Sequence, residues 1–173
     1  MLYVYKEKPI KYTQGDAVLN SLLLFLFVAF IGHWFGAVVL YLSHRFIFHG
    51  KLGKLPVLKD FRRLHAKHHR HLGENEHLFV PFWAKCAILS VIVAVAFVSP
   101  AFSVGLLSFS LLYSFRHFAI HNHDTTSRFH HHHHYHHVKA NKNYSGVYPF
   151  LDKLFGTYEK PIPVKVKVRN KKS

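Results

Sequence analysis

Residues 18–42 form a stretch of 25 residues that contains no Asp, Glu, Lys or Arg. As an α-helix this stretch would be ~37 Å long at ~1.5 Å per residue, enough to cross the ~30 Å hydrocarbon core of a bilayer with some tilt. A helix that is apolar on all sides is poorly suited to the surface of a soluble domain. We therefore expect a transmembrane helix over residues 17–43, preceded by an N-terminal segment over residues 1–16.

A second apolar region covers residues 80–115 and is divided by Ser99 and Pro100. Proline ends one helix and can open the next, so this region predicts a helical hairpin with limbs at 81–99 and 101–115. The second limb is short for a full span, at ~22 Å, and is expected to continue as far as His121. The expected fold is an all-α membrane protein with about three transmembrane helices, one long span plus a hairpin. At 173 residues the chain is expected to form a single domain, residues 1–173.

The expected hairpin returns to the side of the membrane that it left, so the polar segments 44–79 and 116–157 and the basic tail 158–173 share one side. Of the 23 Lys and Arg residues, 8 lie in 44–79 and 11 in 116–173. The positive-inside rule places that side in the cytoplasm. We expect an integral membrane protein, in the inner membrane if bacterial or the endoplasmic reticulum if eukaryotic, with a cytoplasmic C-terminus. Orientation and anionic headgroups explain the net charge of +15, so no nucleic-acid partner is expected.

Histidines gather in the same polar segments. Ten of the 18 form four clusters: His44 and His49; His65, His68 and His69; His117 and His121; His133, His136 and His137. The second and fourth clusters have the spacing i, i+3, i+4, and the third has i, i+4, so the members of each share one helix face. The five-residue spacing of the first places its members ~140° apart on a helix, which suits a frayed helix end. Ten neutral imidazoles could hold two metal ions with about five ligands each, and imidazole suits iron, zinc or copper.

The last cluster leaves one register open, because His132 and His133 both share a helix face with His136. His132 is therefore the alternative ligand to His133. The remaining histidines are expected to be exposed or to surround the ligands: His71, His77, His123, His130, His131, His132 and His134. Within the first apolar stretch, His33 is expected to hydrogen-bond inside the helix bundle. Cys86 is the only cysteine; it excludes an internal disulfide or a cysteine-rich metal site and is expected to be a packing residue.

The order of spacings H-x4-H, H-x2-HH, H-x3-H and H-x2-HH resembles the fatty acid hydroxylase / sterol desaturase superfamily of integral-membrane di-iron enzymes. Downstream, residues 141–157 (NKNYSGVYPFLDKLFGT) are similar to the family's Asn-Tyr-Gly-like turn followed by Asp-x-Leu-Phe-Gly-Thr, with Ser145 as an extra residue. The resemblance covers about residues 40–157. One such motif is weak evidence, whereas four in order between apolar helices are strong evidence.

This resemblance implies an O2-dependent oxidoreductase, a di-iron monooxygenase that inserts a hydroxyl group into an unactivated C–H bond of a fatty-acyl or related lipid. The ten clustered histidines would hold two iron ions in a cytosolic helical cap, with O2 as co-substrate and with zinc able to replace iron in purified protein. No catalytic side chain is expected beyond this di-metal centre. Because ligating histidines usually donate their second N–H to a carboxylate or carbonyl, Asp124 and Asp152 are candidates for that outer role.

Other interpretations stay open at this stage. A carotenoid hydroxylase has similar histidine motifs, although the third motif here has three intervening residues rather than four, and a sterol or lipid desaturase shares the di-iron core. A non-enzymatic membrane metal-binding or transport protein would need ionisable residues within the spans, and only His33 qualifies. The chain contains no haem or flavin motif, so we expect an external electron donor of the cytochrome b5, ferredoxin or reductase type. A homo-oligomer that completes the membrane unit is also compatible with the sequence.

Overall fold

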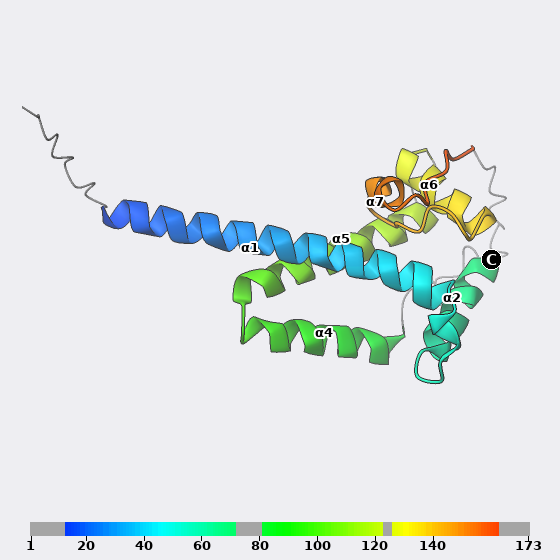
Figure 1. The fold of residues 1–173 in the computed structure, drawn as a ribbon, viewed down its shortest axis with the longest axis horizontal. Helices are drawn as coiled ribbons and strands as arrows, with labels where there is room; N and C mark the ends of the chain where they lie inside the picture. The colour runs from blue at the N-terminus through cyan, green and yellow to red at the C-terminus, as the bar shows by residue number, and fades with distance from the viewer. Residues whose placement is uncertain (1–12, 72–80, 123–125, 163–173) are drawn as a thin grey trace, which may run out of the picture.

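The computed structural model describes residues 13–71, 81–122 and 126–162, and every regular element within these ranges is helical. The elements in chain order are α1 (Gln14–Ser43), the π-helix η1 (His44–Phe48), the 3₁₀-helix η2 (Leu52–Lys54), α2 (Lys59–Arg70), α4 (Phe82–Ala96), α5 (Pro100–Asn122), α6 (Arg128–Val138) and α7 (Pro149–Leu154). For the described residues, the prediction of an all-helical fold is confirmed. In Figure 1 the three long helices, α1, α4 and α5, run roughly along one direction, and α2, α6 and α7 gather near one end of them.

Helix α1 is the long apolar element that the uncharged stretch predicts. Thr13 caps its start: the Thr13 side chain accepts from the Asp16 N–H at 3.3 Å, and the Asp16 carboxylate accepts from the Thr13 N–H at 2.8 Å. Together with η1 it forms a helical run over Gln14–Phe48 that is long and apolar enough to cross a membrane. Only 11% of its most apolar part is buried. It is the one helix in the described ranges that meets both criteria. The outward-facing apolar surface therefore fits a lipid environment better than a protein core.

Helices α4 and α5 form the predicted hairpin, and Pro100 opens its second helix. Helix α4 has 15 residues, ~22 Å at ~1.5 Å per residue, and α5 continues well past residue 115, as expected. At the turn between them Phe97 and Val98 are each 88% exposed. The prediction that Cys86 is a packing residue is wrong: it is exposed on α4, because this helix buries Ala84 and Ile92 instead.

Glycines let α1 and α5 cross closely. A Cβ atom added at Gly32 would lie 2.3 Å from the carbonyl oxygen of Phe102, and one added at Gly105 would lie 2.0 Å from that of Ala29. Real Cβ atoms do not approach backbone so closely, so each position requires glycine. Small residues that bring two backbones together are a common basis for helix association in membranes.

The buried core lies where residues 144–157, called the returning segment below, pack against α1 and α5. Its members are Ala37 and Tyr41 from α1, Phe109 from α5, and Tyr144, Val147 and Leu151 from the returning segment. The Tyr41 hydroxyl and the Thr157 hydroxyl are 2.7 Å apart, which ties α1 to the end of the same segment. The returning segment is therefore fixed against both long helices, and Figure 1 shows α7 beside α5.

Candidate metal centre

Helix α2 separates its histidines from its cations, and the three histidines share one face as their spacing predicts. His68 is buried and His65 and His69 are partly buried. The exposed side carries Lys59, Arg63, Lys67 and Arg70. This helix is held next to η1 by Arg62, whose guanidinium donates to the carbonyl of Gly50 at 2.5 Å.

The first histidine pair lies in a π-helix rather than at a frayed helix end. Residues 44–48 form η1, and the His49 N–H donates to the His44 carbonyl at 3.1 Å, an i to i+5 hydrogen bond. In a π-helix the wider turn brings residues five apart into neighbouring positions, and such turns are frequent at functional sites. The rings of His44 and His49 are accordingly 5.0 Å apart between centroids. The pair does lie at the end of α1, as predicted, but the backbone there is a regular π-helix and not a frayed end.

Helices α5 and α6 supply the other histidines. His117 and His121 follow one another on α5, as their spacing predicts, with ring centroids 4.8 Å apart. Helix α6 starts at a proper cap, since the Ser127 side chain accepts from the His130 N–H at 3.1 Å. Along it, His133 and His137 point the same way, with their Nε2 atoms 3.0 Å apart.

The structure brings nine of the ten clustered histidines into two groups, in each of which the ligand atoms all lie within 4.8 Å of one another. The five-histidine group consists of His44, His49, His65, His69 and His136. The four-histidine group consists of His68, His121, His133 and His137. The groups adjoin, because the ring centroids of His69 and His137 are 4.3 Å apart. The tenth histidine, His117, is buried beside the four-histidine group, 4.9 Å from the rings of both His68 and His133.

The contacts of His65 are those expected of nitrogens arranged to share a cation rather than to hydrogen-bond with one another. Its Nε2 atom lies 2.9 Å from that of His44, 2.8 Å from that of His49 and 2.9 Å from that of His69. A ring nitrogen either donates one hydrogen or accepts through one lone pair, so three such contacts cannot all be hydrogen bonds. Two imidazole nitrogens bound ~2.1 Å from one ion and a right angle apart would be ~3.0 Å from each other. The observed spacing thus fits a set of nitrogens that share a metal ion.

Burial keeps these histidines neutral, which is the form that binds a metal ion. Burial, with smaller contributions from His69 and Arg62, lowers the pKa of His49 to about 4, and burial lowers the pKa of His69 to about 4. For His133 and His137, burial first and then the neighbouring rings hold the pKa well below its usual value. At neutral pH the lone pairs of these rings are therefore free to serve as ligands.

Two histidines of the five-histidine group, His44 and His136, have their outer nitrogens held by backbone. The Nδ1–H of His44 donates to the Tyr144 carbonyl at 2.5 Å, and that of His136 donates to the Lys142 carbonyl at 2.7 Å. Because Nδ1 carries the hydrogen, Nε2 carries the lone pair, so both rings are fixed in the tautomer that a metal ion requires. In the four-histidine group the buried Nδ1 atoms of His133 and His137 have no hydrogen-bond partner in the described part of the chain.

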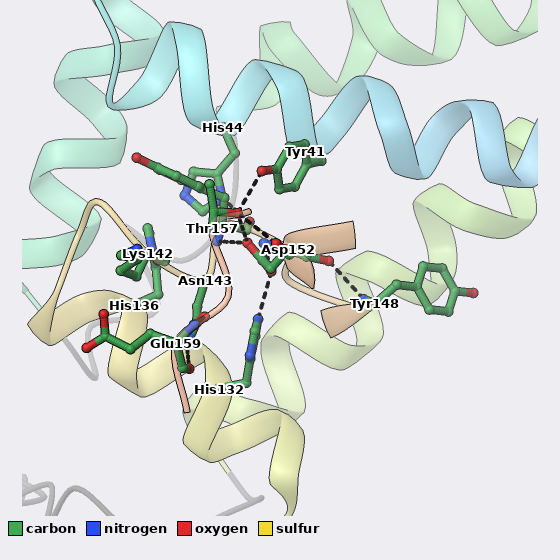
Figure 2. A network of polar contacts seen from close by, with 12 residues as sticks. Tyr41, His44, His132, His136, Lys142, Asn143, Tyr148, Asp152, Thr157 and Glu159 are labelled. Carbon is green, nitrogen blue, oxygen red and sulfur yellow. Dashed lines mark hydrogen bonds and ion pairs between the residues drawn. The ribbon is translucent and has the colours of Figure 1, made fainter. Parts of the chain in front are cut away.

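Asp152 organises the loop that provides those carbonyls. It is fully buried, and its carboxylate accepts from the backbone N–H groups of Tyr144 at 2.7 Å and Ser145 at 2.9 Å. It also accepts from the Thr157 hydroxyl at 2.7 Å and contacts the Nε2 atom of His132 at 3.0 Å. Figure 2 shows this network around Asp152, beside His44 and His136. Asp152 therefore reaches the candidate ligand His44 through the backbone of Tyr144.

The same contact distinguishes His132 from His133. The Nε2 atom of His132 points at Asp152, whereas that of His133 lies 2.9 Å from the Nε2 atom of His121 inside the four-histidine group. The remaining histidines surround this arrangement. His71 is exposed, and His130 and His134 are buried with their rings 4.0 Å apart. Three predicted positions lie outside the described residues: Asp124, His77 and His123.

Two features of the centre have no counterpart in the histidine pattern. The carbonyls of Lys142 and Tyr144 orient ligand rings, but a backbone acceptor leaves no trace in residue type. The positive φ of 56° at Asn143, between them, is an indirect signal, because asparagine tolerates the left-handed region better than most residues. The asparagine of the Asn-Tyr-Ser-Gly turn thus marks the point at which the loop bends toward the rings.

The geometry defines a class of protein: the described residues form only helices, with a long outward-facing apolar helix and two adjoining, nitrogen-only groups that could each hold a metal ion. The family model for fatty acid hydroxylases matches residues 22–157, which include both groups. The chain belongs to the fatty acid hydroxylase family, a membrane-associated, iron-dependent family whose members are typically oxidoreductases. Comparisons with curated proteins and with solved structures each return no match.

Proposed function

We propose that this protein is an O2-dependent di-iron hydroxylase that inserts a hydroxyl group into an unactivated C–H bond of a fatty-acyl or related lipid. The observation that carries the proposal is the pair of adjoining histidine groups, whose ring nitrogens are neutral and converge. His117 is included as a fifth ligand of the four-histidine group, because its ring already contacts that group. Two bound iron ions would supply O2 activation, with one oxygen atom entering the lipid and the other leaving as water after uptake of two electrons and two protons.

The residues of the chain do the remaining work. The carbonyls of Lys142 and Tyr144 fix the rings of His136 and His44, so that ligand geometry is set before a metal ion arrives. The apolar outer surfaces of α1, α4 and α5 are exposed, which fits a substrate that approaches from the lipid phase. The cations of segments 44–79 and 116–173 support placing the metal centre on the cytoplasmic side.

The electrons are proposed to come from a separate carrier with an acidic surface. Helix α2 has its histidines on the metal side and exposes Lys59, Arg63, Lys67 and Arg70 on the other. A carrier docked on these cations would be one helix diameter, ~10 Å, from the ligands. Replacing Arg63 and Lys67 with Glu should raise the KM for an acidic carrier and leave the metal content unchanged. An unchanged KM in this variant would argue against docking on α2.

The experiment that tests the function is lipid analysis of cells grown under ¹⁸O2 with and without the chain, combined with iron counting on purified protein. We expect one labelled oxygen per product molecule and two iron ions per chain. His68→Ala and His136→Ala should abolish the product while the protein stays in the membrane. His71→Ala, which alters an exposed histidine outside both groups, is the matched control and should retain activity. A hydroxylated product that carries unlabelled oxygen would contradict the proposal.

The alternative functions give different results in the same experiment. A desaturase would yield an unsaturated lipid without labelled oxygen, and a carotenoid hydroxylase would label carotenoid and leave acyl lipids unchanged. A metal-transport protein would give no lipid product and would need polar residues along α1. Residues 18–42 of α1 contain no Asp, Glu, Lys or Arg, so His33 is the candidate there, and both of its ring nitrogens are already engaged in hydrogen bonds.

A further inference from the structure

His33 lies in the middle of the apolar helix α1, eleven residues before His44. At ~1.5 Å per residue it is ~16 Å along the helix from the metal ligands. Its ring is engaged at both nitrogens, as the sequence predicts: Nδ1 is 2.8 Å from the Ser108 hydroxyl on α5, and Nε2 is 2.6 Å from the Tyr148 hydroxyl. The ring thus links α1 to both α5 and the returning segment.

The hydrogen-bond partners determine which way each bond runs. The Ser108 hydroxyl donates to the carbonyl of Gly105 at 2.7 Å, so its oxygen accepts from Nδ1–H of His33. A neutral imidazole with its hydrogen on Nδ1 has its lone pair on Nε2. Nε2 must therefore accept from the Tyr148 hydroxyl. Each hydrogen in this series of hydrogen bonds therefore has a single acceptor. The tautomer of His33 is fixed in an apolar setting, where an unpaired polar group is costly.

The hydrogen bond between His33 and the Tyr148 hydroxyl is called the tether below, and Tyr148 connects it to the metal centre. Its backbone N–H donates to the Ser145 hydroxyl at 3.0 Å, and the Ser145 N–H donates to Asp152. The preceding residue, Tyr144, provides the carbonyl that orients His44. Figure 2 shows Tyr148 at the edge of the network around Asp152. The side chain of Tyr148 thus secures one end of the segment 144–148, and the other end contacts a ligand.

Aromatic packing holds the tether in place. The ring of Tyr148 is 4.6 Å from that of Trp34, and the ring of His33 is 5.5 Å from that of Phe109, between centroids. With both rings packed, rotation of His33 away from Tyr148 would break these contacts as well as the hydrogen bond.

We propose that His33 is a positioning residue of the metal centre: through the Tyr148 hydroxyl it fixes segment 144–148 and thereby the ring of His44 in the five-histidine group. The inference rests on the proposed function only in assigning the centre to catalysis. Its effect on metal binding stands apart from turnover. Within the described residues, no hydrogen bond or ring contact joins His121, His133 or His137 to this segment, so we expect the tether to act chiefly on the metal ion of the five-histidine group.

The test uses the full-length, metal-free protein in detergent, with Co²⁺ as the probe and its absorption spectrum as the readout. Tyr148→Phe removes one oxygen atom. It should weaken binding of the Co²⁺ ion in the five-histidine group by about tenfold, at the lower end of losses seen for outer partners of metal ligands. His33→Phe should do the same, and the double variant should be no worse than either single one. His33→Gln, whose amide oxygen can replace Nε2 as acceptor, should restore binding. Ser108→Ala is the matched control, since it removes the other hydrogen bond of His33 and keeps both partners of the bond to Tyr148.

A purely structural role for His33 would give another pattern. Equal weakening of both Co²⁺ ions, or additive losses in the double variant, would overturn the proposal, as would unchanged binding in Tyr148→Phe. Tyr148→Phe keeps the test valid even if His33→Phe fails to fold. Wild-type protein that binds two Co²⁺ ions in this test, but gives no hydroxylated lipid in the cell experiment under ¹⁸O2, would refute the proposed function. The proposal for His33 would be unaffected.

Discussion

The five-histidine group and the four-histidine group use the same ligand type and adjoin each other, yet their outer nitrogens meet different surroundings. In the first, His44 and His136 donate to backbone carbonyls of a loop that Asp152 organises. In the second, the Nδ1 atoms of His133 and His137 are buried without a partner in the described residues. Outer hydrogen bonds fix the tautomer and direction of a ligand ring. The two positions are therefore unequally prepared for a metal ion, the five-histidine position being the better one.

The largest effect is expected from removing a ligand of the four-histidine group. His133→Ala should abolish hydroxylation and leave one iron ion per chain, in the five-histidine group. His132→Ala is the comparison, because that side chain contacts Asp152 and lies outside both groups. It should keep two iron ions and measurable activity. Iron counting and product analysis on both variants decide the matter, and the reverse result would assign the ligand role to His132.

Graded chelation sharpens the comparison in the wild-type protein. We expect the two ions to differ in affinity by about 10–100-fold, the range that outer partners of ligands contribute, with the four-histidine ion leaving first. Titration with chelators of increasing strength, followed by metal analysis and the Co²⁺ spectrum, measures this. Simultaneous loss of both ions would show that the two groups are equally stable.

Replacing Asp152 should make the two groups alike. In the wild type each carboxylate oxygen of Asp152 accepts a hydrogen bond from a backbone N–H, one from Tyr144 and one from Ser145. In Asp152→Asn the amide NH2 would face one of these N–H groups instead of accepting from it. An unsatisfied buried donor costs about 1–3 kcal/mol, so the melting temperature should fall. The loop carbonyl should also lose its fixed direction, which lowers the affinity of the five-histidine ion toward that of the other. Thermal unfolding and Co²⁺ titration test both parts; weaker binding of the four-histidine ion alone would be the opposite of this expectation.

The smallest effect on the metal-loaded protein is expected from pH, which acts mainly on the metal-free form. In the folded chain the pKa of His49 and of His69 is about 4, against a usual 6.5. Between these values the unfolded chain binds more protons than the folded one, so the free energy of unfolding falls as the pH drops from 6.5 toward 4. Melting temperatures of metal-free protein at pH 7, 6 and 5 should decrease in that order. Metal-loaded protein should be less sensitive above the pH at which its ions leave. A constant melting temperature in the metal-free form would show that these rings are not desolvated.

Sequence spacing predicted the local geometry of the centre well where the backbone is regular. The i, i+3, i+4 pattern of α2 placed its three histidines on one face, although the structure divides them between the two groups. The pair His44 and His49 defeated the same reasoning, because a π-helix changes the angle per residue and has no residue-type signature. Regular periodicity therefore predicts which side chains can meet, and irregular backbone has to be seen.

Long-range contacts account for the other limits. His132 and His133 are equivalent by spacing, and the choice between them depends on Asp152, twenty residues further along the chain. The helical hairpin of α4 and α5 followed from one proline, but the outward position of Cys86 did not, because an apolar helix does not reveal from its sequence which apolar residues face the protein. Spacing describes one element at a time, whereas these outcomes depend on which elements become neighbours.

The turn between α4 and α5 has a consequence for biogenesis. Residues 86–115 contain no charged side chain, and the turn itself exposes Phe97 and Val98. In the proposed topology the pair can enter the bilayer from the cytoplasmic face without any charged loop being translocated, since transfer of charge is the costly part of insertion. In that topology the histidine motifs on either side of the hairpin would be released into one compartment, where metal could be loaded once the chain is complete.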